Sequence, residues 1–552
     1  MNTLLFLIFY NIAHFSGRGL IKLYKTIFAR DFDIKNFYVS KNITLETFYS
    51  LFFLFFCGNY LFLFNFFAPI KFAIPSLLIF LLIFFIYGFI DIKSNKLNSF
   101  QFIINNVVFP LLVGISSYGI RFHYDAGAYH LGTQNWLYNS KISFGLVNIN
   151  TFYSYANLNE YLSSALWVIN NFLYSHFLHL IFFVVFYSYL HSTIRQNENF
   201  FLRNVSILIL IYSIIDNIGI GGGSNGFIQI QTIGKQDTAV GILIFFTFIV
   251  FINDSINSSF TKKGFAFIGF SSFLAFQLKI TAALLLIIIL VYLYNLLKNS
   301  HSILFKETIA LLLLFIFWSI KSFIISSCFI FPVLSTCNKN VSWSAYSRIK
   351  SAKNGTIEGN YAYRFGDNLF QWLNEWINIQ FSFQIFSNFL FSLVFILVIR
   401  NLLFNKKNIY KIHKNHLITS LLFLLINIFF FFTSVPVYRN GFGIFLAIVA
   451  VFGLGTEDFK VSIKIVPVFW SILLILSMAA LPRGYMYKEF LNQPSTLNEL
   501  QPNKEFYLHV NDTKWVYSTN NQCWASLNCT SKNRIILEYS LGKYKMFANG
   551  NS

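Results

Sequence analysis

Apolar runs long enough to cross a membrane recur along this chain and dominate its organisation. A helix of about 20 apolar residues spans the ~30 Å hydrocarbon core of a bilayer. Hydrophobic residues make up 56% of the sequence and charged residues 11%, which is well below the usual charged share of a soluble domain. The runs predict an all-α polytopic membrane protein with about 13–14 transmembrane helices. The expected spans are residues 3–15, 47–66, 72–90, 101–120, 176–191, 204–220, 238–253, 264–278, 280–297, 308–327, 383–403, 417–433, 441–455 and 462–480.

Lysine and arginine gather in two segments, 16–45 and 400–416. Cytoplasmic loops retain positive charge, so both segments are expected on the cytoplasmic face. The same rule explains the net charge of +20, and no basic stripe with interleaved aromatic residues supports nucleic-acid binding. Counting spans outward puts the remaining long segments on the extracytoplasmic face: loops 121–175, 221–237, 328–382 and 434–440, and the tail 481–552. Within the first loop, residues 160–175 are apolar and are expected to form a reentrant or interfacial helix.

Four of the five cysteines fall in segments that this topology places outside the cytoplasm. Cys328 and Cys337 begin one outer loop, and Cys523 and Cys529 lie in the tail. Two short-range disulfides are expected there, because that compartment is oxidising, although four free thiols fit the spacing as well. Cys57 lies in the middle of a span and is expected to be inert packing.

Composition divides the chain into three regions: N-terminal transmembrane helices with a basic loop (1–100), a transmembrane core (101–480) and a tail (481–552). The tail contains three prolines and the strand-like stretches "KEFYLHV", "KWVYS" and "RIILEYS". These features predict a small extracytoplasmic α+β unit that needs docking or its disulfide for stability.

Asp125 is the acid that the sequence singles out, in "RFHYDAGAYHLGTQNW" just beyond the fourth expected span. An outer-face acid at that depth could serve as a general base or hold a divalent cation such as Mg²⁺ or Mn²⁺. Capping of the following helix explains Asp125 equally well. His123 and His130 are seven residues apart, which is not a usual metal-ligand spacing, so they and Tyr124 are expected to contact lipid or substrate hydroxyls.

Three cations stand near the outer ends of expected spans: Lys279, Lys321 and Arg439. A cation at membrane depth is costly and suggests a function, although Lys279 could equally snorkel to the surface. Together the three could neutralise a phosphate or diphosphate at the lipid interface.

Two outer loops carry weaker signals. The glycine-rich loop "NIGIGGGSNGFIQIQTIGKQDTAV" is no P-loop, and turn formation explains its glycines better than ligand binding; its Asp237 is expected to cap the next helix. The loop 338–382 is rich in Trp, Tyr, Asn and Arg, which stack on sugars but are also typical of interfacial segments. No GxSxG elbow supports serine-hydrolase chemistry.

An apolar helix is followed by an outer loop that opens with the acid of "FHYDAGAYHLGTQNWLYNSKISFG", then by further spans and an outer C-terminal unit. This order of segments resembles that of the GT-C superfamily of membrane glycosyltransferases. The resemblance implies a polyprenyl-phosphate-linked sugar donor. It also implies that Asp125 is the catalytic acidic residue that GT-C enzymes carry in their first large outer loop. Many GT-C enzymes have a second acid in this loop, whereas Ala126 and Gly127 follow Asp125 here. The stretches "YDAGAYHLGTQNW", "QDTAVGILI" and "FQLKIT" look more closely like uncharacterised bacterial inner-membrane proteins from surface-polysaccharide gene clusters.

Three functions fit these expectations. The first is a multi-pass inner-membrane glycosyltransferase of cell-envelope polysaccharide biosynthesis, in which Asp125 activates a glycan acceptor while Lys321 and Arg439 hold the donor phosphate. The second is a polymerase of lipid-linked repeat units of the O-antigen or capsule type. It would rely on outer-loop arginines such as Arg348, Arg364 and Arg439. The third is a flippase or transporter of lipid-linked glycans, for which the sequence offers no convincing internal repeat.

Overall fold

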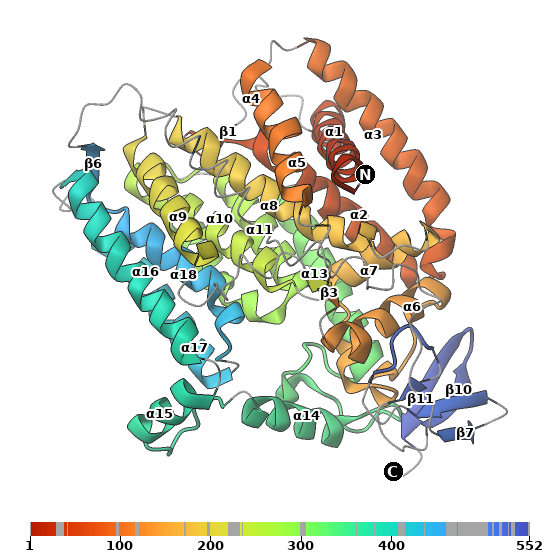
Figure 1. The fold of residues 1–552 in the computed structure, drawn as a ribbon. Coiled ribbons are helices and arrows are strands. Elements are labelled where there is room, and N and C mark those ends of the chain that lie inside the picture. The colour runs from red at the N-terminus through yellow and green to blue at the C-terminus, as the bar shows by residue number, and fades with distance from the viewer. Residues whose placement is uncertain are drawn as a thin grey trace.

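The fold is a helical bundle with a small strand-containing region near the C-terminus, described here from a computed structural model (Figure 1). The structure describes residues 2–28, 38–40, 42–94, 99–115, 117, 121–122, 124–169, 173–195, 199–218, 232–233, 236–298, 305–359, 361–379, 382–406, 414–434, 436–459, 472, 506–510, 513–517, 522–527, 529–530 and 536–549.

Seven of the described helices are long and apolar enough to cross a membrane. They are Asn2–Ile27, Leu45–Asn65, Leu173–Ile194, Asp237–Ile256, Ile280–Lys298, Thr308–Ser326 and Leu417–Ser434. Shorter apolar helices cover Ile74–Ile90, Phe100–Gly114, Phe200–Ile215, Leu390–Leu403 and Phe442–Phe452. These helices agree with a membrane protein of several helical spans, and by length and composition seven candidates, rather than the predicted 13–14, are found among the described residues. The expected span at 462–480 lies outside the described residues apart from Ile472.

The described helices contain between 5 and 27 residues. In chain order they are α1 (Asn2–Phe28), α2 (Tyr49–Asn65), α3 (Ile74–Ser94), α4 (Ser99–Ile103), α5 (Phe109–Gly114), α6 (Leu131–Asn139), α7 (Leu158–Ala165), α8 (Leu173–Ile194), α9 (Phe200–Ile218), α10 (Asp237–Ile256), α11 (Lys262–Leu278), α12 (Leu286–Lys298), α13 (Phe305–Ser326), α14 (Tyr346–Gly359), α15 (Leu369–Ile379), α16 (Ser382–Leu403), α17 (Lys414–Ser434) and α18 (Phe442–Phe452). Short 3₁₀ or π turns include η1 (Leu45–Phe48), η3 (Ile104–Val108), η5 (Ala126–His130), η8 (Leu166–Ile169), η10 (Ile280–Leu285) and η13 (Tyr438–Gly441).

Strands are few and short. They are β1 (Tyr38–Ser40), β2 (Ile43–Thr44), β3 (Arg121–Phe122), β4 (Thr232–Ile233), β5 (Phe404–Lys406), β6 (Thr456–Phe459), β7 (Phe506–Val510), β8 (Thr513–Tyr517), β9 (Cys529–Thr530), β10 (Ile536–Leu541) and β11 (Tyr544–Asn549). β7 and β8 pair in antiparallel fashion, β9 joins β8 in parallel, and β10 and β11 form an antiparallel hairpin. The three strand-like stretches of the tail are thus confirmed as strands.

The described segments between helices gather at two opposite ends of the bundle (Figure 1). We call one end the loop end; it carries residues 124–169, α14, α15 and the C-terminal strands. Asn148 there donates from Nδ2 to the carbonyl oxygens of Trp343, at 3.0 Å, and Phe547, at 2.9 Å. At the other end β5 pairs with β6, and Arg400 donates to the carbonyl oxygen of Phe452 at 2.6 Å. Described loop segments therefore occupy both ends of the bundle.

Several helices differ in extent from the predicted spans. The first continues from residue 15 to Phe28, because the polar segment after it remains helical and buries Arg18 beside Glu46, at 3.5 Å. The apolar stretch 160–175 does not span: α7 has only eight residues and continues into the 3₁₀ turn η8. α7 packs on α6 and α2, as an interfacial segment would.

α1 crosses α3 at two glycines. A Cβ atom on Gly19 would lie 1.8 Å from the carbonyl oxygen of Phe84, and one on Gly88 would lie 2.0 Å from that of Phe15. Small residues allow this approach, and close packing of backbones is a main source of helix association in lipid.

Replacing Gly88 by alanine should therefore destabilise the bundle by about 1–3 kcal/mol, because the backbones must separate to admit one methyl group. Gly355 is the matched control, since nothing lies within 4 Å of a Cβ atom placed there. Gly355→Ala should be neutral or stabilising, as alanine favours helix over glycine. SDS-induced unfolding of the detergent-solubilised variants measures both effects; equal stabilities would contradict the glycine contact.

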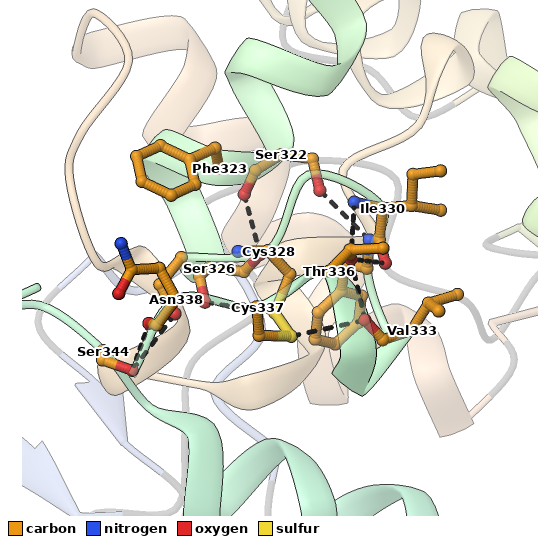
Figure 2. The surroundings of a disulfide bond; sticks show 12 residues. Ser322, Phe323, Ser326, Cys328, Ile330, Val333, Thr336, Cys337, Asn338 and Ser344 are labelled. Carbon is orange, nitrogen blue, oxygen red and sulfur yellow. Dashed lines mark hydrogen bonds between the residues drawn. A yellow bond between two sulfur atoms is a disulfide. The ribbon is translucent and has the colours of Figure 1, made fainter. Parts of the chain in front are cut away.

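Both predicted disulfides form: Cys328–Cys337 and Cys523–Cys529. Figure 2 shows the first, in a loop that follows α13. The loop is held by the backbone N–H of Asn338, which donates to the carbonyl of Ser327 at 2.8 Å, and by the N–H of Phe329, which donates to that of Thr336 at 3.1 Å. Cys57 is buried in α2 as a free thiol, as expected.

Thiol counting tests this arrangement. The denatured protein, unreduced, should take one maleimide label, on Cys57, and after reduction it should take five. The Cys57→Ala variant should take one label fewer in each state. Mass spectrometry of intact protein counts the labels, and more than one label without reduction would show that a pair is open.

Candidate functional site

Asp125 lies at the start of the short helical segment η5, but it does not cap it. Its backbone is already helical, with φ −64° and ψ −23°, and its side chain makes no capping hydrogen bond. The half-buried carboxylate instead accepts a hydrogen bond from the hydroxyl of Tyr129, with 3.3 Å between Oδ2 and the phenolic oxygen. The capping explanation for Asp125 is therefore not supported by its geometry.

Tyr129 lies among several acidic groups. Burial raises the pKa of its hydroxyl well above the ordinary range. Neighbouring acidic groups raise this pKa further; they are Asp125, Tyr155, Glu160 and Asp237. The Tyr129 hydroxyl therefore stays protonated and acts as a donor. We call Asp125, Tyr129, His130, Glu160 and Asp237 the Tyr129 cluster.

Glu160 is the most fully engaged acid of the Tyr129 cluster. Its carboxylate, 2% exposed, pairs with Nδ1 of His130 and accepts a hydrogen bond from Nε2 of Gln134 at 2.8 Å. The indole N–H of Trp167 donates to Oε1 of Gln134 at 3.0 Å. Asn157 caps α7 by accepting from the backbone N–H of Glu160 at 3.1 Å, which fixes the acid in the first helical turn. The acid is thus held by partners from three segments.

Asp237 and Lys279 form an ion pair. Asp237 is the first residue of α10, and Gln236 occupies the capping position, so the expectation that Asp237 caps the helix is wrong. Its carboxylate accepts from Nζ of Lys279, which lies in the extended junction between α11 and η10. Nζ also donates to Oδ1 of Asn440 in η13, at 2.5 Å. The lysine side chain keeps 32% of its surface exposed, whereas that of Asp237 keeps 3%.

The other cations of the sequence hypothesis are placed differently. Lys321 is 2% exposed; its Nζ donates to the carbonyl oxygen of Ala156 at 2.6 Å and lies 3.7 Å from the ring centroid of Trp318. It therefore supports the loop before α7 from within the bundle. Arg439 lies in η13, next to the residue that binds Lys279, and its side chain is outside the described residues. Lys279 and the backbone of Arg439 thus lie together at η13, whereas Lys321 contacts the carbonyl of Ala156.

The two remaining predicted residues flank Asp125. His123 lies outside the described residues. Tyr124 is 56% exposed, and its carbonyl oxygen accepts from Nε2 of Gln522 at 3.2 Å. His130 is buried against Glu160, and its ring is tilted against that of Tyr129, with ring centroids 4.2 Å apart.

The disulfide loop of the tail covers the segment that begins with Asp125. The backbone N–H of Trp524 donates to the carbonyl of Gly127 at 2.8 Å, and Asn135 donates to that of Ala525 at 2.5 Å. A Cβ atom on Gly127 would lie 2.1 Å from Oε1 of Gln522, which explains why glycine stands two residues after the acid. The tail is therefore part of the surroundings of the candidate site.

Among the described residues, no three His, Cys, Asp or Glu side chains are grouped so that they could hold a metal ion. The arrangement offers a carboxylate held by a protonated phenol, two further buried acids and a partly exposed lysine. Sequence reasoning missed Tyr129, Gln134 and Glu160. Glu160 could have been recognised as a candidate site residue from the sequence. Only 21 acidic residues occur in the chain, and this one lies in a segment too apolar for a solvated loop.

Comparison with known proteins adds a family. Residues 1–446 match the family described as Domain of unknown function (DUF8201). The chain belongs to this family. The match includes all residues of the Tyr129 cluster, Lys279 and Arg439, and ends before the tail of this DUF8201 protein. No curated protein and no solved structure shows significant similarity to it.

Glu160→Gln should lower the free energy of unfolding of the DUF8201 protein by about 1–3 kcal/mol, since it removes the buried carboxylate to which His130 and Gln134 are hydrogen-bonded. Glu358→Gln is the matched control: its partner is Arg364, at 2.8 Å, and both side chains are more than half exposed. That change should cost at most about 1 kcal/mol. SDS-induced unfolding measures both variants, and similar losses would contradict the structural role of Glu160.

Proposed function

We propose that this protein is a GT-C-type membrane glycosyltransferase of cell-envelope polysaccharide biosynthesis. It would transfer a sugar from a polyprenyl-phosphate-linked donor to a cell-surface glycan or lipid-linked acceptor. The observation that carries the proposal is the state of Asp125: its carboxylate is not used for capping and is oriented by the Tyr129 hydroxyl at the loop end of the bundle. A positioned carboxylate there has the chemistry that the GT-C resemblance requires.

The proposed reaction is a single inverting displacement. Asp125 takes the proton of an acceptor hydroxyl as its oxygen attacks the anomeric carbon, and the bond between that carbon and the donor phosphate oxygen breaks. The electron pair of that bond leaves with the lipid phosphate. Because the pKa of Tyr129 is raised, its hydroxyl remains a donor and holds the Asp125 carboxylate in place.

Lys279 is the cation best suited to the leaving phosphate. It is partly exposed and contacts η13, which also carries Arg439. Asp237 holds Lys279 in position before the sugar donor binds. A cation that is already in place needs little reorganisation when negative charge develops on the leaving phosphate. Lys321 is a positioning residue in this scheme, because it binds the Ala156 carbonyl beside Tyr155 and Asn157.

The extracytoplasmic side of a bacterial inner membrane fits the distribution of cysteine and charge. Both disulfides lie at the loop end, and disulfides persist in oxidising compartments. The described parts of the basic segments around Arg18 and Arg400 lie toward the opposite end, which suits the cytoplasm. A lipid-linked donor is available on that side without nucleotide, which agrees with the lack of a P-loop.

The polymerase alternative is less well supported. It predicts arginines that work together on a lipid diphosphate. Arg348 instead donates to the carbonyl oxygen of Asn148 at 2.9 Å, whereas Arg364 pairs with Glu358 on the surface. The two contacts belong to different segments of the loop end.

Asp125→Asn should lower glycan formation by about 10²–10⁴-fold, because it removes a general base without changing side-chain volume. Asp367→Asn is the control, an exposed acid at the same end that accepts from the backbone N–H of Arg364 at 3.1 Å, and it should retain activity. The assay is complementation of a deletion strain, with surface glycan separated on gels and membrane-inserted protein quantified in parallel.

Full activity of a normally inserted Asp125→Asn protein would remove the proposed mechanism. Mass analysis of the product separates the transferase from the polymerase. A gain of one sugar supports the transferase, and growth by whole repeat units supports the polymerase.

A further inference from the structure

A polar cavity of about 70 Å³ lies in the bundle among α1, η1, α4, η3 and α8. Its lining includes His14, Glu46, Thr47, Asn105, Asn106 and Ser188. None of the residues of the Tyr129 cluster lines it, and Arg18 and Glu46 place it toward the end opposite the loop end. It is therefore separate from the candidate glycosyl-transfer site and does not depend on the proposed function.

The cavity is lined by buried polar groups that lack protein partners. Both ring nitrogens of His14 and the side-chain oxygens of Asn105 and Asn106 make no hydrogen bond within the described residues. His14 and Asn106 are each only 3% exposed. Buried polar atoms nearly always have a hydrogen-bond partner, because leaving one without a partner destabilises the fold. The unpartnered atoms of these three side chains therefore indicate that the cavity holds a molecule or group that forms hydrogen bonds with them.

The backbone is arranged to present these amides. η3 is a π-helix, a rare conformation that is frequent at functional sites. Pro110 follows it and has no N–H to donate to the carbonyl four residues earlier, that of Asn106. That carbonyl accepts instead from Nδ2 of Asn11 at 2.8 Å. The Nδ2 of Asn106 donates to the carbonyl of Phe102 at 3.3 Å, so its side-chain oxygen is the atom left over.

Charge and size restrict the occupant. Glu46 and Arg18 lie 3.5 Å apart and neutralise one another, so the lining favours an uncharged group. The unpartnered amide atoms are acceptors, which require hydroxyl or N–H donors. One water needs about 10–15 Å³ of such volume, so the cavity has space for a group of several heavy atoms, about the size of glycerol.

We propose that this cavity binds a small polyhydroxy group of the glycerol type. The group can be a free polyol or the headgroup of a glycerol-bearing lipid, since both offer the same hydroxyl donors. Asn106, Asn105 and His14 accept or exchange hydrogen bonds with its hydroxyls. Binding satisfies atoms that the folded chain leaves without partners.

Saturation-transfer NMR with glycerol tests the proposal on the full-length protein in a detergent that contains neither sugar nor glycerol. The wild type should transfer saturation to glycerol, and Asn106→Leu should reduce the signal about fivefold or more, as expected for loss of a hydrogen bond to a buried partner. Asn427→Leu is the matched control: this buried asparagine in α17 also donates to the carbonyl four residues earlier, at 2.8 Å, and does not line the cavity.

His14→Phe serves as a second variant if Asn106→Leu does not fold. It keeps the ring that stacks on Tyr10, with centroids 5.9 Å apart, and removes both nitrogens. Native mass spectrometry with added phosphatidylglycerol or phosphatidylethanolamine identifies the source of the group. Preferential phosphatidylglycerol adducts that Asn106→Leu or His14→Phe abolishes indicate a lipid headgroup, and glycerol signals without that preference indicate a free polyol. Equal glycerol signals in all proteins, with no lipid preference, would mean that only water fills the cavity and would overturn the proposal.

Discussion

The buried carboxylate of Glu160 is the interaction on which the loop end depends. A carboxylate in an apolar environment is costly unless it is paired and hydrogen-bonded. Here His130 of η5, Gln134 of α6 and the capped first turn of α7 all converge on it. Three short helical segments that could not be stable alone are thereby fixed to one another. The orientation of Asp125, one turn before His130, follows from this arrangement.

The large-scale architecture was predictable from the sequence because the bilayer imposes it. Apolar length predicted the helices and cysteine position predicted the disulfides; seven described helices are long and apolar enough to cross a membrane, and both disulfides form. The strands of the tail were predictable from alternation, as β7 and β10 illustrate. What failed were local lengths: α1 continues to Phe28, because helix propensity does not stop where hydrophobicity does.

The candidate site was predictable only in part. Asp125 could be singled out by its depth, but its state depends on Tyr129, whose other acidic neighbours include residues of α7 and α10. Spacing along the sequence does not show which side chains of separate helices come into contact in the folded protein. The same limit explains Lys321: its position near the end of α13 suggested a phosphate ligand, whereas three-dimensional packing directs it to Ala156. Lys279 has the better position because an extended junction, not a helix, carries it.

The contact between Gln522 and Tyr124 joins residues 398 positions apart. The residues that pack on the segment after Asp125 are therefore synthesised only when the chain is nearly complete. Every described span precedes these residues in the sequence. Membrane integration and completion of the site are consequently separate events. A chain interrupted after α18 would have the described helices of a finished protein, yet it would leave the segment around Gly127 open to solvent.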